Sequence, residues 1–106
     1  MELTQSIFLQ ALEHDKYFEA SQLYLARWQK LGQNHSERDI YKGFINGAAA
    51  FDMIEKGKYK AAKHVWKIYE KYRSLISEEQ EHYKLFKNAD RVLMKLRTKY
   101  KKIFDT

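Results

Sequence analysis

The sequence has no cysteine, no proline and only four glycines among its 106 residues. Without cysteine the chain can form no disulfide and has no thiolate chemistry. Proline and glycine are the residues that most often interrupt helices, so their scarcity, together with 32% charged residues, favours a helical protein. A chain of this length holds one core. We therefore predict a single all-α domain over residues 1–106.

Long apolar runs are also missing. No stretch approaches the ~18–20 apolar residues that are needed to cross a bilayer. The N-terminal segment "MELTQSIFLQALEHDKY" has no basic region and its apolar stretch is interrupted, unlike a signal peptide. The absence of cysteine fits a reducing compartment. We expect a soluble, cytoplasmic protein without a membrane partner.

The sequence does contain many apolar residues spaced three and four apart, the period of an amphipathic helix. This period predicts a compact bundle of about five helices, at residues 4–13, 17–31, 37–56, 59–76 and 77–104. The last helix would open with "SEEQ", a capping-box pattern. At ~1.5 Å per residue it would be about 40 Å long. We expect the end of this long C-terminal helix to project or to pack on another chain.

Two of the four glycines, Gly43 and Gly47, fall in "KGFINGAAAF" within the predicted third helix. A glycine inside a helix costs roughly 1 kcal/mol relative to alanine. The helix is apolar almost all round, which is typical of a central helix. We predict that Gly43, Gly47 and Ala50 form a strip on which a neighbouring helix packs closely. A phosphate-binding loop is disfavoured, because no strand precedes the glycines and no lysine or serine follows at the required spacing.

Three segments together resemble a known family. They are "YFEA" followed by Trp28, then "GFINGAAA", and then the G-x-x-x-A-A pattern that starts at Gly57. This combination is similar to the domain-of-unknown-function 309 family, which comprises small all-helical proteins of bacteria and archaea. The resemblance covers about residues 8–76, with matches at Tyr17, Glu19, Ala20, Trp28, Gly43, Ile45, Ala48, Ala50, Gly57 and Ala62. It implies that the second and third helices face each other.

The chain departs from the family pattern at the family's ionisable positions. The family's His-Glu pair falls on Ser21 and Gln22, and its next glutamate falls on Leu25. The family's glutamine falls on Asn46, and its later histidine on Met53. A metal-binding or acid–base role proposed for the family could not be carried by these residues.

Ser21 and Asn46 are the polar residues that remain at these positions. We predict that they approach each other in the core. One interpretation is a satisfied buried polar pair, because buried amides need partners. The other is a ligand-binding pocket, which would require several convergent polar groups. We favour the first.

No catalytic or metal-binding constellation can be recognised. The four histidines, His14, His35, His64 and His82, include no pair at the i, i+4 spacing of a helical metal site. No nucleophile, base and orienting group can be assigned together. We predict a protein without metal, cofactor or enzymatic activity.

Five lysines are spaced 4, 3, 4 and 4 residues apart, and we call them the lysine ridge: Lys56, Lys60, Lys63, Lys67 and Lys71. They lie on the side of the predicted fourth helix opposite Trp66 and Tyr69. The net charge of the chain is +6. Such a ridge could bind the phosphates of nucleic acid, or another polyanion, without reading sequence. The alternative is a solvated face that keeps the protein soluble.

The predicted C-terminal helix carries apolar residues at heptad spacing, the pattern of a helix seam. Self-association would bury four of them: Leu93, Leu96, Tyr100 and Ile103. The first functional hypothesis is therefore a non-enzymatic helical module that binds another protein or itself, in the latter case as a homodimer. The alternative hypothesis is nucleic-acid or polyanion binding through the lysine ridge.

Overall fold

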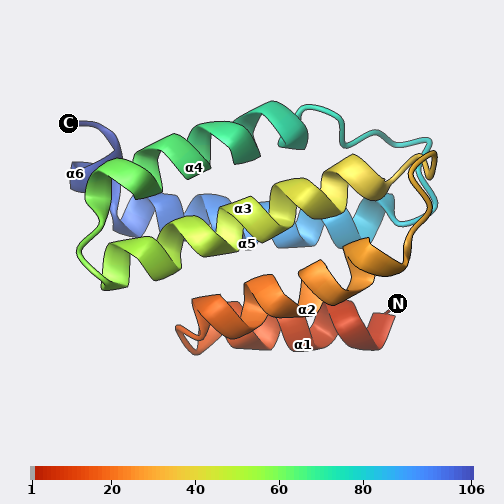
Figure 1. Cartoon of the computed structure of the whole chain (residues 1–106), viewed down its shortest axis with the longest axis horizontal. Helices are drawn as coiled ribbons and strands as arrows, with labels where there is room; N and C mark the ends of the chain where they lie inside the picture. Colours follow the sequence, from red (N-terminus) through yellow and green to blue (C-terminus); the bar gives the residue numbers. More distant parts are fainter. Residues whose placement is uncertain (1) are drawn as a thin grey trace.

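The computed structural model describes residues 2–106 and shows six helices in this range (Figure 1). They are α1 (Glu2–Glu13), α2 (Tyr17–Lys30), α3 (Arg38–Glu55), α4 (Tyr59–Arg73), α5 (Tyr83–Lys99) and α6 (Lys101–Phe104). The described part of the chain contains no strand. The prediction of an all-α bundle is confirmed. Within residues 2–106, no helix combines the length and the apolarity that a membrane span requires.

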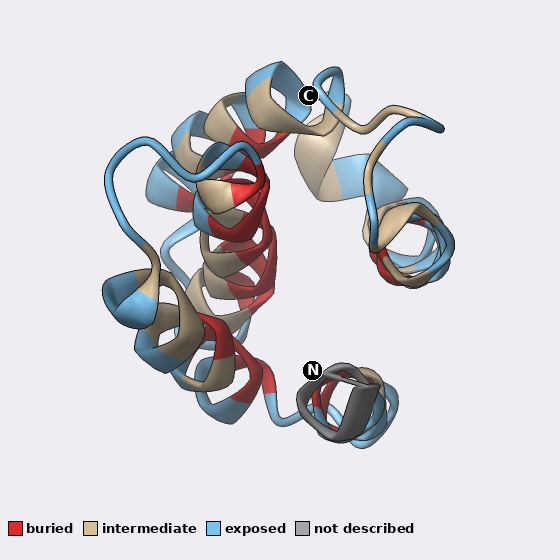
Figure 2. Cartoon of the chain, turned by 90° about the vertical axis from the view of Figure 1, so that its right-hand side faces the viewer, coloured by how far each residue is buried: buried red, intermediate tan, exposed pale blue. Residues whose placement is uncertain are grey.

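Helix α3 is the centre of the bundle. It runs between the α1–α2 pair and α4 in Figure 1 and packs against α2, α4 and α5. Nine of its 18 residues are buried, which is why this helix lacks a wide polar face. Figure 2 shows that the buried residues of the chain gather on the helix sides that face the interior.

The glycines of α3 allow α4 and α5 to come close. A Cβ atom added at Gly43 would lie 2.7 Å from the Cβ of Tyr72. One added at Gly47 would lie 3.0 Å from both the Tyr69 ring and the Leu93 side chain. A Cβ contact of 2.7 Å essentially never occurs in proteins, and one of 3.0 Å would require the neighbouring side chain to move. The predicted packing role of these glycines is confirmed.

The core is largely aromatic, and Phe44 of α3 lies at its middle. Its ring centroid is 5.5 Å from that of Tyr24 in α2 and 6.1 Å from that of Phe8 in α1. On the other side it is 5.8 Å from Phe86 in α5 and 6.0 Å from Tyr69 in α4. Rings at these separations attract one another beyond the burial of their area. One side chain thus joins all four surrounding helices.

The prediction of one long, projecting C-terminal helix is wrong. Helix α5 ends at Lys99, and the backbone leaves helical geometry at Tyr100 with φ −105° and ψ 27°. The short α6 then places the ring of Phe104 5.3 Å from Trp66 and 5.9 Å from Phe51. Partial burial of the Phe104 ring against these two side chains favours the break over a continued helix.

Candidate functional site: a basic cleft between α4 and α6

The structure divides the lysine ridge. Lys60, Lys63, Lys67 and Lys71 lie on α4, but Lys56 directly follows α3. The ammonium of Lys56 is 2.9 Å from Asp52 and lies over the ring of Phe18. Gly57, with φ +74°, makes the turn that separates this lysine from α4. The ridge is therefore not one continuous helix face.

Three lysines of the ridge share a cleft with α6. The cleft has a volume of about 620 Å³, and we call it the basic cleft. Its lining comprises Tyr59, Lys60, Lys63, His64, Lys67, Lys102, Ile103 and Thr106. Four of these side chains are lysines, and no aspartate or glutamate occurs among the described residues that line it. The fold thus adds Lys102, from far along the sequence, to three lysines of α4.

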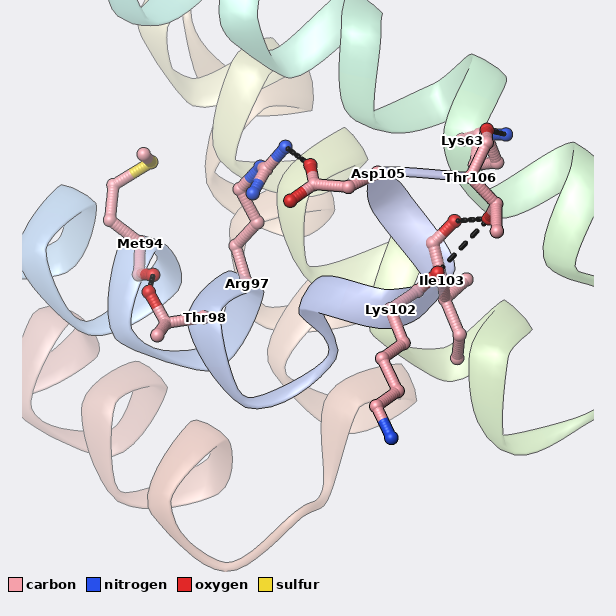
Figure 3. A network of polar contacts seen from close by, with 8 residues as sticks. All are labelled: Lys63, Met94, Arg97, Thr98, Lys102, Ile103, Asp105 and Thr106. Carbon is pink, nitrogen blue, oxygen red and sulfur yellow. Dashed lines mark hydrogen bonds and ion pairs between the residues drawn. The ribbon is translucent and has the colours of Figure 1, made fainter.

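Hydrogen bonds around α6 hold this arrangement in place (Figure 3). The Lys63 ammonium donates to the backbone oxygen of Thr106 at 2.5 Å. The Thr106 hydroxyl donates to the carbonyl oxygens of Ile103 at 2.7 Å and Lys102 at 3.0 Å. In Figure 3 the ammonium of Lys102 points away from the Lys63–Thr106 contact. Lys102 is therefore placed by the backbone of α6 and presents its charge to solvent.

An ion pair engages the one carboxylate side chain of the α6 segment. Asp105 accepts a hydrogen bond at 2.8 Å from the guanidinium of Arg97 on α5. The same guanidinium lies 5.4 Å from the centroid of the Phe104 ring. Arg97 thus balances the one acidic side chain of the segment 101–106.

Tyr59 brings an aromatic ring to the basic cleft, and sequence reasoning missed it. The helical spacing assigns Tyr59 to the same side as the buried Ala62 and Trp66, yet 51% of Tyr59 is exposed. The reason is that a helical side chain covers the turn N-terminal to its own Cα. Tyr59 is the first residue of α4, so no such turn exists beneath it. The position of Tyr59 at the start of the predicted fourth helix was the sequence signal that could have indicated its exposure.

The predicted polar pair of Ser21 and Asn46 is not formed. The hydroxyl of Ser21 is buried and donates to the carbonyl of Phe18 at 2.7 Å, within α2. The amide of Asn46 is only partly buried and donates to the carbonyl of Lys42 at 2.8 Å, within α3. Each side chain finds its acceptor one helical turn away, so neither needs the other. The residues bring no convergent polar groups together.

The four residues of the predicted self-association seam pack against the core of the chain itself. Leu93 is fully buried against α3. Leu96, Tyr100 and Ile103 are partly buried and pack against the same core. The break at Tyr100 makes this possible, because it turns the seam toward α3 and α4. Self-association remains a prediction that these four residues no longer support.

An ionic network around the buried carboxylate of Asp90 joins α4 to α5, and the sequence did not reveal it. Arg73 donates two hydrogen bonds of 2.7 Å to the carboxylate of Asp90, and the Tyr69 hydroxyl donates to the same carboxylate. Burial alone would raise the pKa of Asp90, but the bonds from Arg73 and Tyr69 outweigh it and lower that pKa from its ordinary 3.8. Burial and the charge of Asp90 raise the pKa of Tyr69. Arg73, Asp90 and Tyr69 thus bind one another and hold α4 against α5.

The histidines do not form a metal site. His82 is 2.7 Å from the buried carboxylate of Glu37, a contact that ties the start of α5 to the start of α3. His64 lies in the basic cleft. Among residues 2–106, no group of three or more histidine, aspartate or glutamate side chains is placed to hold a metal ion.

A second depression lies along α1 and α2 and has a volume of about 800 Å³. It contains two exposed apolar side chains, Ile7 and Phe18. Its charged residues are of both signs, since Glu19 lies there with Lys16 and Lys30. Nothing in the described structure shows what would cover this groove. The basic cleft is the better defined site because its charges are of one sign.

Comparisons with known proteins identified no relative of this chain. No family model matches the chain, and neither a curated protein nor a solved structure matches it. The resemblance to the domain-of-unknown-function 309 family therefore stays a prediction. The function has to be argued from the geometry of the site.

Proposed function

We propose that the protein binds nucleic acid by holding its phosphates in the basic cleft. The observation that carries this proposal is that four lysines, Lys60, Lys63, Lys67 and Lys102, line one cleft. Lysine ammonium groups bind phosphates as point charges and read no sequence. The proposed activity is therefore binding without base specificity from these four residues.

The dimensions of the cleft suit a phosphate chain. Lys60 and Lys67 are seven residues apart on α4, which corresponds to about 10 Å along the helix at ~1.5 Å per residue. One strand of B-DNA carries a charge every ~3.4 Å along the helix axis, and neighbouring phosphates lie farther apart than this along the backbone, so about two phosphates span this distance. The spacing of the lysines thus matches a run of phosphates better than a single small anion.

The charge of the cleft is poorly compensated within the protein. Neither Lys60 nor Lys67 makes an ion pair with another described residue, whereas Lys56 pairs with Asp52. Like charges three or four residues apart on a helix repel each other by a few tenths of a kcal/mol. A bound polyanion would relieve this repulsion. This energetic argument favours binding over a face that serves solubility alone.

The test is fluorescence anisotropy of a labelled oligonucleotide titrated with protein at several salt concentrations. With four phosphate contacts, the slope of log K against log salt is expected to be about −3 for a single strand, and affinity should fall about 50-fold between 50 and 200 mM salt. No binding at 50 mM salt would overturn the proposal. Equal displacement by poly-glutamate at the same charge concentration would also overturn it, because the site would then be a general polyanion binder.

Two matched double variants distinguish the effect of the cleft lysines on binding from the effect of net charge. Lys60→Gln with Lys67→Gln removes two charges from the basic cleft, and Lys56→Gln with Lys71→Gln removes two ridge charges outside it. We expect the first pair to reduce the salt slope by about half. The second pair should change it much less. Equal effects of both pairs would show that the whole ridge, rather than the cleft, attracts the nucleic acid.

A further inference from the structure

The basic cleft contains more than phosphate-binding groups require. Tyr59 and Ile103 line it together with the lysines. Tyr59 is half exposed, so its ring is accessible from solvent. The Tyr59 hydroxyl can donate to a phosphate oxygen, but its ring adds an apolar face that phosphate binding alone does not use. The ring therefore favours a ligand that has both negative charge and an apolar surface.

A nucleobase supplies that apolar surface only when it is unstacked. In a duplex the faces of the bases are covered by their neighbours, and a protein reaches the backbone and the base edges in the grooves. In a single strand the faces are accessible and stack on aromatic side chains beside a positively charged groove, at roughly 1–3 kcal/mol per base by alanine substitution. The composition of the basic cleft follows this second pattern.

We infer that the basic cleft selects single-stranded over double-stranded nucleic acid by stacking a base on Tyr59. This inference rests on the proposed function, because the lysines must hold the phosphates on either side of the stacked base. Tyr59 precedes Lys60 directly and Lys63 by about one turn of α4, and all three residues line the basic cleft. A base on the ring would thus have its flanking phosphates next to these lysines.

The experiment compares Tyr59→Ala and Tyr59→Phe with the unmodified chain. The probes are a labelled single-stranded oligo-uridine of twelve nucleotides and a blunt DNA duplex of twelve base pairs. We expect Tyr59→Ala to weaken binding of the single strand about tenfold and to leave duplex binding within about twofold. Tyr59→Phe should bind the single strand like the unmodified chain, because stacking needs the ring and not the hydroxyl. The salt slope should be unchanged in both variants, because neither removes a charge.

The outcomes distinguish this inference from the proposed function. If Tyr59→Ala binds the single strand normally while the Lys60→Gln and Lys67→Gln pair weakens binding, the stacking inference is overturned and phosphate binding stands. If neither variant changes binding, the proposed function itself fails. Equal weakening of single-strand and duplex binding by Tyr59→Ala would also overturn the inference, because it would indicate a role in shaping the cleft. Thermal unfolding of each variant verifies that the fold is retained.

Discussion

The two sides of α4 differ in how their polar groups are used. On the inner side, Tyr69 and Arg73 are bound to the buried carboxylate of Asp90. On the outer side, Lys60 and Lys67 are exposed and have no ion pair among the described residues. The inner groups are satisfied by the fold, and the outer ones are left for a ligand. We therefore expect substitutions on the inner side to change stability and those on the outer side to change binding.

The largest effect is expected from Asp90→Ala. Removal of one partner from a buried ion pair typically costs about 3–5 kcal/mol, because the other charge is left uncompensated. Here the Tyr69 hydroxyl also loses its acceptor. Because the Arg73 side chain is 36% exposed and water can solvate it once its partner is removed, we expect a smaller fall in the free energy of unfolding in urea, of about 2–3 kcal/mol. The control is Asp105→Ala, which breaks the more exposed pair with Arg97 and should cost less than about 1 kcal/mol.

The same carboxylate should give the protein a stability that depends on pH. Because the pKa of Asp90 is lower in the folded chain than its ordinary 3.8, the folded state binds this proton less readily than the unfolded state. The contribution is therefore complete above the ordinary pKa and is lost as the pH falls through the folded pKa. In Asp90→Asn this acid-dependent loss should be smaller. If the free energy of unfolding fell with acid equally in Asp90→Asn and in the unmodified chain, other carboxylates would dominate the pH dependence.

A smaller loss is expected from Gly43→Val, on the side of α3 that receives α4. The new Cβ would collide with the Cβ of Tyr72, which is an atom of fixed position near the backbone. Overpacking of this kind costs about 1–3 kcal/mol, measurable by urea unfolding. Gly32→Val is the control, since no atom lies within 4 Å of an added Cβ there. Equal effects at both positions would contradict the close approach of α3 and α4.

The helices are the part of the fold that local sequence could predict. The 3.6-residue spacing of apolar residues located the five longer helices and the central position of α3. It failed at the chain end, because the break at Tyr100 is favoured by the burial of Phe104 against Phe51 and Trp66. These contacts join residues from three helices. No local propensity encodes them.

The helix start after residue 76 illustrates the same limit. The capping-box bond predicted from "SEEQ" is present, since the side chain of Gln80 accepts from the backbone N–H of Ser77 at 3.0 Å. It closes an isolated turn, and α5 begins only at Tyr83. His82, the residue before α5, instead contacts the buried Glu37. A local signal predicted the bond correctly, and a distant contact decided where the helix begins.

The candidate site was predictable in its charge but not in its shape. The spacing of Lys60, Lys63 and Lys67 indicated a basic helix face, and these three lysines line the cleft. Lys102 joins them only because α6 folds back toward α4. Ser21 and Asn46 were predicted from position in a motif, and each instead bonds within its own helix. Spacing predicts which residues share a helix face, whereas contacts between helices decide which faces meet.

The smallest effect on stability is expected from Lys60→Gln with Lys67→Gln. Neither side chain forms an ion pair with a carboxylate in the described part of the chain, so no stabilising ion pair is lost. Removal of like charges along α4 relieves repulsion of a few tenths of a kcal/mol. The free energy of unfolding should therefore stay within about 0.5 kcal/mol of the unmodified value or rise slightly. A loss above about 1 kcal/mol would mean that the outer side of α4 also supports the fold. The division between a stabilising inner side and a binding outer side would then be wrong, and reduced nucleic-acid binding by this variant could no longer be attributed to the basic cleft alone.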